Sequence, residues 1–194
     1  MILRKFALFF SYTFHPMIIS LVAFWILIFF NSLQSPNANI ILFTCFLFSN
    51  LIPIITVILL RNSGNLWDID ASIIEQRILP LSLGIFYSLL GFLVLYSLEA
   101  EKIVQGLMFC YMTNSIIILG ITRYWKISIH AMGVTGPIAA LWVQGYQFPI
   151  IMSIIILFVG ASRIILKAHN PAQVYTGAAL GFLLTFTQLH LFFL

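Results

Sequence analysis

Seven long apolar runs, separated by short polar connections, are the feature of this sequence that most constrains its fold. The runs cover residues 16–33, 40–60, 79–98, 103–121, 130–143, 148–166 and 171–193. A helix needs about 20 apolar residues to cross the hydrocarbon core of a bilayer. The sequence therefore predicts an all-α integral membrane protein, built as a bundle of six or seven transmembrane helices; the count is six if the first helix is peripheral.

The composition supports this interpretation. The chain is 62% hydrophobic and 7% charged, whereas soluble domains are about 45–50% apolar and about 25% charged. Six or seven crossings use nearly all of its 194 residues, so we predict a single transmembrane domain, 1–194. No basic tract with interleaved aromatic residues is present, which argues against nucleic acid as a partner.

Two local features have simple interpretations. Arg4 and Lys5 followed by an apolar run resemble the start of a signal peptide, but the run continues to about Phe30 and no clear small-residue cleavage site follows. We therefore expect a retained first span. Cys45 and Cys110 lie within apolar runs and lack metal or redox spacing, so we expect buried thiols.

Seven crossings place the N-terminus and the connections after the second, fourth and sixth helices on one side. These segments contain eight of the nine lysine and arginine residues: Arg4, Lys5, Arg61, Arg77, Arg123, Lys126, Arg163 and Lys167. His15, His130 and His169 fall on the same side. Because basic loops favour the cytoplasm, we predict a polar site at the cytoplasmic face of an inner or plasma membrane.

The stretch ASRIILKAHNPAQVYTGAALG, residues 161–181, gathers Arg163, Lys167 and His169 in one connection. A guanidinium group matches phosphate oxygens, and an imidazole titrates near neutrality and can act as nucleophile or general acid. Together these groups suit phosphoryl transfer. Alternatively, Arg163 and Lys167 only stabilise a helix C-terminus and extend toward lipid headgroups.

A second cluster, TRYWKISIHA at residues 122–131, adds Arg123, Lys126, Ser128 and His130. Ser128 is placed to cap the fifth helix, whose N-terminus would be an anion site. Alternatively, Ser128 is a plain N-cap, and the cations only set the topology.

A third connection, residues 61–81, contributes Arg77 together with Asp68 and Asp70. The two aspartates could hold a magnesium ion, or they could belong to a solvated loop. The convergence of three such connections on one side distinguishes a site from scattered topology charges.

Ser162 and Arg163, followed after five residues by His169, resemble the last signature of the type 2 phosphatidic acid phosphatase superfamily. These are membrane lipid phosphatases related to vanadium haloperoxidases, and their signature is Ser-Arg, five residues, His, three residues, Asp. Residues 127–130 resemble the middle signature, Pro-Ser-Gly-His. Residues 70–78, with Arg77, resemble the first, which is Lys, six residues, Arg-Pro. The phosphatase-like core would span approximately residues 61–194.

The resemblance implies a phosphatase or phosphotransferase that acts on a lipid phosphate or isoprenyl diphosphate without a metal or organic cofactor. His169 would form a phosphohistidine, and His130 would protonate the leaving alcohol. Arg77 and Arg163 would hold the phosphate, with the hydroxyl or N–H of Ser128 helping.

The chain departs from the family pattern at several positions. Asp70 stands in place of the family's lysine, so Lys126 or Arg123 would have to supply that cation. Ile78, Ile127 and Ile129 replace the proline of the first signature and the proline and glycine of the middle one.

The sharpest departure is Gln173, which replaces the aspartate that orients the nucleophile. Its carbonyl can accept the Nδ1 hydrogen of His169 but adds no charge. A comparable aspartate-to-amide change in a hydrolase triad lowers the rate about 10⁴-fold. Alternatively, Asn170, Pro171 and Gln173 form a capping box, which would leave nothing to orient His169.

Two other functional classes therefore remain open. One is a catalytically weak or inactive relative that binds anionic lipid headgroups or a partner protein. The other is a magnesium-dependent prenyl or alcohol phosphotransferase, suggested by Asn65, Asp68, Asp70 and Arg77. Glu75 lies in the same connection, and the two other acids, Glu99 and Glu101, fall on the opposite side. The sequence does not define the oligomeric state.

Overall fold

The computed structural model describes residues 2–30, 36–68 and 73–194, and these segments contain helices and no strand. The expected all-α class is confirmed. The helices are α1 (Ile2–Thr13), α2 (Pro16–Phe29), α3 (Ala38–Phe46), α4 (Ile52–Asn62), α5 (Ile78–Ser97), α6 (Lys102–Thr122), α7 (Ile129–Val143), α8 (Pro149–Ile165) and α9 (Pro171–Phe192). A π-helical turn, Leu47–Leu51, joins α3 to α4, and a 3₁₀ turn, Glu75–Arg77, precedes α5.

Several helices have the length and composition of membrane spans. Within the described ranges, four segments are long and apolar enough to cross a bilayer: Ile2–Phe29, Ala38–Asn62, Glu75–Ser97 and Lys102–Thr122. The helices α7 and α8 are apolar but shorter. These helices indicate a membrane protein.

The N-terminal segment differs from expectation because a separate helix, α1, precedes the first predicted run. The chain leaves α1 at Phe14 and enters α2 at Pro16, where proline is well tolerated because the first helical N–H needs no partner. His15 caps α2, with its Nδ1 accepting a hydrogen bond from the Met17 N–H at 3.3 Å. The helix α1 packs against α8.

The second predicted run, 40–60, is also interrupted. Pro53 follows the π-helical turn and has no N–H to donate to the carbonyl of Ser49. A π-helical turn is a usual way to absorb such a break within a longer helix. The two halves therefore form one continuous helical segment, Ala38–Asn62, which we call the α3–α4 rod.

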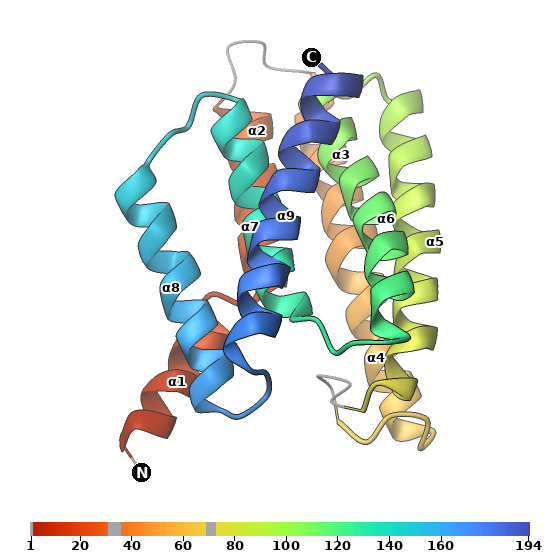
Figure 1. Cartoon of the computed structure of the whole chain (residues 1–194). Helices are drawn as coiled ribbons and strands as arrows, with labels where there is room; N and C mark the ends of the chain where they lie inside the picture. Colours follow the sequence, from red (N-terminus) through yellow and green to blue (C-terminus); the bar gives the residue numbers. More distant parts are fainter. Residues whose placement is uncertain (1, 31–35, 69–72) are drawn as a thin grey trace.

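The polar connections lie at one end of the bundle (Figure 1). The helix α1, the adjoining ends of α4 and α5, and the α6–α7 and α8–α9 connections share this end, and the C-terminus lies at the opposite end. Residues Cys45 and Cys110 are fully buried in the main apolar cluster, as expected.

The helix α9 packs closely against α7, and two glycines permit the close approach. A Cβ added at Gly177 would lie 2.5 Å from the backbone oxygen of Ser128, and one added at Gly181 would lie 2.6 Å from that of Met132. Because these obstacles are backbone atoms, they cannot move aside cheaply. The two glycines therefore hold the start of α9 against the start of α7.

We expect Gly177→Ala to lower the free energy of unfolding by about 1–3 kcal/mol, the usual effect of overpacking. The matched control is Gly120→Ala in α6, where a Cβ would meet nothing within 4 Å, and this variant should retain the wild-type melting temperature. Thermal unfolding in detergent measures both. Equal melting temperatures for the two variants would contradict the packing role.

Candidate functional site

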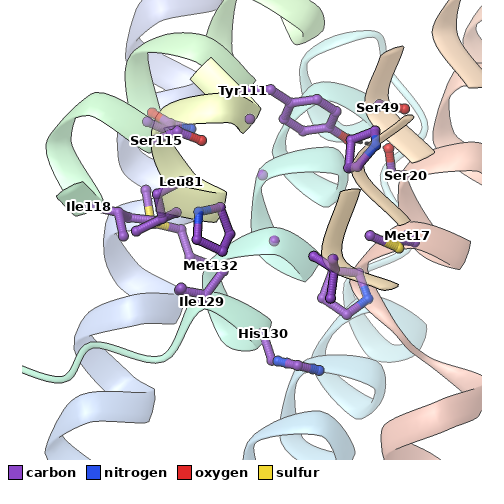
Figure 2. Close-up of a pocket in the computed structure, with 18 of the residues that line it drawn as sticks. Met17, Ser20, Ser49, Leu81, Tyr111, Ser115, Ile118, Ile129, His130 and Met132 are labelled. Carbon is purple, nitrogen blue, oxygen red and sulfur yellow. Dashed lines mark hydrogen bonds between the residues drawn. The ribbon is translucent and has the colours of Figure 1, made fainter. Parts of the chain in front are cut away.

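A cavity of about 440 Å³ opens among α2, α4, α5, α6 and α7, and its charged end carries the chemistry. The groups at that end are His15, Arg77, His130, Arg163 and His169. Most of the remaining wall is apolar. Figure 2 shows His130 at one end of the cavity and Tyr111 with Ser20 toward the other. The cavity therefore has charged and titratable groups at one end, and the rest of its wall is mostly apolar.

Two buried arginines supply the positive charge. Arg77 ends the 3₁₀ turn before α5, is 4% exposed, and donates from Nη1 to the Ile127 carbonyl at 3.0 Å. Arg163 lies in the last turn of α8, is 5% exposed, and donates from Nη1 to the Ser11 hydroxyl at 3.2 Å. Guanidinium groups present forked donors to phosphate, and their field is strong where water is excluded. The arrangement favours an anion in the cavity.

Gln173 holds the His169 ring in the α8–α9 connection. The Gln173 Oε1 atom lies 3.2 Å from His169 Nδ1, and the Lys126 carbonyl oxygen lies 3.3 Å from the same nitrogen. Two carbonyl oxygens facing Nδ1 favour the tautomer with its proton there. The Nε2 atom then carries a lone pair, as a nucleophile requires.

The same glutamine also closes the capping box of α9. Its Oε1 accepts a hydrogen bond from the Asn170 N–H at 3.1 Å, while its own N–H donates to Asn170 Oδ1 at 2.9 Å. The capping box is confirmed, but the expectation that it would leave His169 unoriented is wrong. A single carbonyl oxygen can accept from two donors because it has two lone pairs.

The environment keeps His169 neutral. Burial, followed by the positive charge of Arg77, lowers the pKa of His169 to about 4; Arg163 and Lys126 act in the same direction, and the hydrogen bond to Gln173 opposes them. Burial and the charge of Arg77 also lower the pKa of Lys126. At pH 7, His169 is therefore an unprotonated imidazole beside cationic groups.

The middle cluster divides into groups at the cavity and groups outside it. His130 lines the cavity. Ser128 is fully buried, does not line the cavity, and caps α7 by accepting from the Ala131 N–H at 3.3 Å. The backbone N–H of Ser128 donates a hydrogen bond to the backbone carbonyl of Gln173 at 3.2 Å. The structure thus confirms that Ser128 caps α7, and its expected contact with the phosphate stays a prediction.

Arg123 and Lys126, the two candidates to replace the family's lysine, differ in exposure. Neither residue lines the cavity; Arg123 is exposed, whereas Lys126 is half-buried and close enough to affect the His169 pKa. Of the first signature, Asp70 lies outside the described residues. Within the described ranges, no cluster of three His, Cys, Asp or Glu residues could hold a metal ion.

Sequence reasoning missed His15 and Ser11 as parts of the site. The His15 and His130 rings meet edge to face, with centroids 5.0 Å apart. Ser11 reaches Arg163 from α1, 152 positions away in the sequence. The one available signal for His15 was its place directly before Pro16 on the polar side.

Comparisons with family models, with curated proteins and with solved structures found no match to this chain. The resemblance to the lipid phosphatases therefore rests on the signature residues.

We expect the His169 imidazole to titrate near pH 4 in the wild type. The substitution Gln173→Glu keeps the side-chain length of the capping box but places a carboxylate at Nδ1. An opposite charge at this distance should raise the His169 pKa by about 1–3 pH units. Histidine NMR titration of the detergent-solubilised protein measures the change, and an unmoved titration would contradict the contact between Gln173 and His169.

Proposed function

We propose that this protein is a metal-independent membrane phosphatase, or a phosphotransferase, that acts on a lipid phosphate through a phosphohistidine intermediate. The observation that carries the proposal is the convergence of four residues from three separate connections. Arg77, His130, Arg163 and His169 line one end of a single cavity whose remaining wall is largely apolar. A phosphate at the charged end and a lipid chain in the interior would match this division.

The proposed reaction begins with the substrate phosphate held between Arg77 and Arg163. The Nε2 lone pair of His169 attacks phosphorus, so that a P–N bond forms as the P–O bond to the lipid breaks. His130 donates a proton to the leaving oxygen and becomes a base. It then takes a proton from water, whose oxygen attacks the phosphohistidine and releases phosphate. An alcohol in place of water would make the reaction a transfer.

We expect Gln173 to lower the rate of turnover. It orients the ring of His169 but cannot neutralise the positive charge that develops there during attack. This uncharged partner favours the alternative of a catalytically weak or inactive relative that binds anionic lipid headgroups or a partner protein.

We further propose that α2, the α3–α4 rod, α5, α6, α7, α8 and α9 each cross the bilayer. The helix α1 would then lie at the cytoplasmic surface beside the charged end of the cavity. This arrangement explains why the basic connections share one end.

Reporter tags at the two termini should fall on opposite sides of the membrane, with the N-terminal tag in the cytoplasm. An odd number of crossings requires opposite sides, and the excess of basic residues sets the direction. Protease protection of tagged protein in sealed vesicles measures both positions. Tags on the same side would contradict the seven-crossing arrangement.

Purified protein in detergent should release phosphate from phosphatidic acid, phosphatidylglycerol phosphate or an isoprenyl diphosphate, with equal rates in the presence and absence of EDTA. His169→Ala should lower turnover about 1,000-fold or more, since it removes the nucleophile. The matched control is His190→Ala, near the opposite end of the bundle, which should leave turnover unchanged.

Turnover that survives His169→Ala would contradict the mechanism, and inhibition by EDTA would favour the magnesium-dependent class. Vanadate separates the remaining alternatives, because it mimics phosphate without being hydrolysed. Stabilisation by vanadate in a protein without turnover would support the inactive, anion-binding relative.

A further inference from the structure

The helix α1 packs against α8 along one of its faces. Its two buried residues are Ala7 and Ser11, one turn apart. Phe10 lies on the same face and stacks on Phe158 of α8, with ring centroids 4.3 Å apart. The other residues of α1 are exposed. Figure 1 shows α1 beside α8 at the end of the bundle that carries the polar connections, with its N-terminus pointing away from the bundle.

A second face of α1 is apolar and exposed. Ile2, Phe6 and Phe9 fall within about 60° of one another around the helix axis at 3.6 residues per turn, and each is more than half exposed. We call these three residues the apolar face. Contiguous apolar surface of this kind marks a site of interaction with a protein or a membrane. Because α1 ends at Thr13 and α2 begins at Pro16, the apolar face lies at the membrane boundary if α2 crosses the bilayer.

A third face of α1 is cationic. Arg4 and Lys5, which we call the cationic face, lie outside the apolar stripe and are exposed. The helix contains no acidic residue, and Lys167 is exposed in the α8–α9 connection at the same end of the bundle. A helix with an aromatic apolar face and flanking cations lies in the plane of a membrane interface. Its cations are attracted to anionic headgroups, which their long stems allow them to reach.

The packed face of α1 also contacts the candidate site. The Ser11 hydroxyl accepts a hydrogen bond from Arg163 Nη1 at 3.2 Å, and Arg163 lines the cavity. Four residues after Ser11, His15 caps α2 and lines the same cavity. A change in the position of α1 would therefore move the partner of a buried phosphate-binding candidate.

We propose that α1 binds the anionic headgroup surface of the membrane, with its apolar face at the acyl boundary and its cationic face among the phosphates. The bound helix holds Ser11 against Arg163, so that the charge of the membrane surface affects anion binding in the cavity. Surface binding rests on the proposed membrane arrangement and does not depend on catalysis. The effect on Arg163 rests on the anion site of the proposed function.

Spin labelling of single cysteines tests the surface binding. Cys45 and Cys110 are buried, so a nitroxide should attach to Phe9→Cys and leave the unsubstituted protein unlabelled. In vesicles of equal parts phosphatidylcholine and phosphatidylglycerol, oxygen should reach the Phe9→Cys label more readily than a water-soluble nickel chelate does. A label at Tyr12→Cys, which lies seven residues from Lys5 on the same side of α1, should show the opposite preference.

Charge substitutions test the role of the anionic lipid. Arg4→Gln combined with Lys5→Gln should weaken surface binding about 30-fold, since each cation near an anionic surface contributes about 5-fold. The immersed fraction of the Phe9→Cys label should then fall to its value in pure phosphatidylcholine vesicles. Arg61→Gln, which removes an exposed cation of α4 at the same end of the bundle, is the matched control and should leave the immersed fraction unchanged.

Three outcomes would overturn the surface binding. The first is a Phe9→Cys label that the nickel chelate reaches readily in the mixed vesicles, because the apolar face would then lie in water. The second is a label shielded from both reagents, because a protein would then cover this face. The third is equal immersion of the wild-type and doubly substituted helix, because the anionic lipid would then have no effect.

Vanadate binding in the same mixed vesicles tests the effect on Arg163. Arg4→Gln with Lys5→Gln should weaken vanadate binding about 10-fold, within the usual range of coupling between two sites, and Arg61→Gln should not. In a Ser11→Ala background the double substitution should have no further effect, whereas additive effects would contradict the coupling through Ser11. Absence of vanadate binding to the wild type would contradict the proposed function and with it the effect on Arg163. The label measurements decide the surface binding in either case.

Discussion

The burial of two guanidinium groups at one cavity is the constraint on which the rest of the site depends. Arg77 and Arg163 are nearly inaccessible, and charges in such a setting require hydrogen-bond partners. Arg77 donates to the α6–α7 connection at Ile127, and Arg163 donates to α1 at Ser11. These hydrogen bonds hold the α6–α7 connection and α1 at the charged end of the cavity. Burial has the largest effect in lowering the pKa of His169, and the same charges add to it, so that the imidazole stays unprotonated.

Gln173 links helix capping to the chemistry of the site. Its side-chain oxygen Oε1 accepts the hydrogen bond from the Asn170 N–H that completes the capping box of α9, and the same atom faces His169 Nδ1. The glutamine therefore gives His169 an uncharged partner that is fixed by the capping box. Its backbone carbonyl also accepts a hydrogen bond from the Ser128 N–H.

Much of the site was predictable because its chemistry is local. Arg163 and His169 lie in one connection, and the caps at Ser128 and Asn170 follow from residue type and spacing, as the structure confirms. The contacts of Ser11 with Arg163 and of His15 with His130 were not predictable, since they join α1 and the start of α2 to segments more than 100 residues away. Ser11 and His15 reach these partners because the helix breaks before Pro16, which separates α1 from α2.

The sequence by itself determined the helical class and the membrane character, because apolar runs of this length leave few other ways to satisfy the backbone. It also determined which residue types could hold phosphate. The tertiary structure alone decided that one cavity is lined by Arg77, His130, Arg163 and His169. The reason is that the close approach of α9 to α7 at Gly177 depends on contacts between chain segments far apart in sequence.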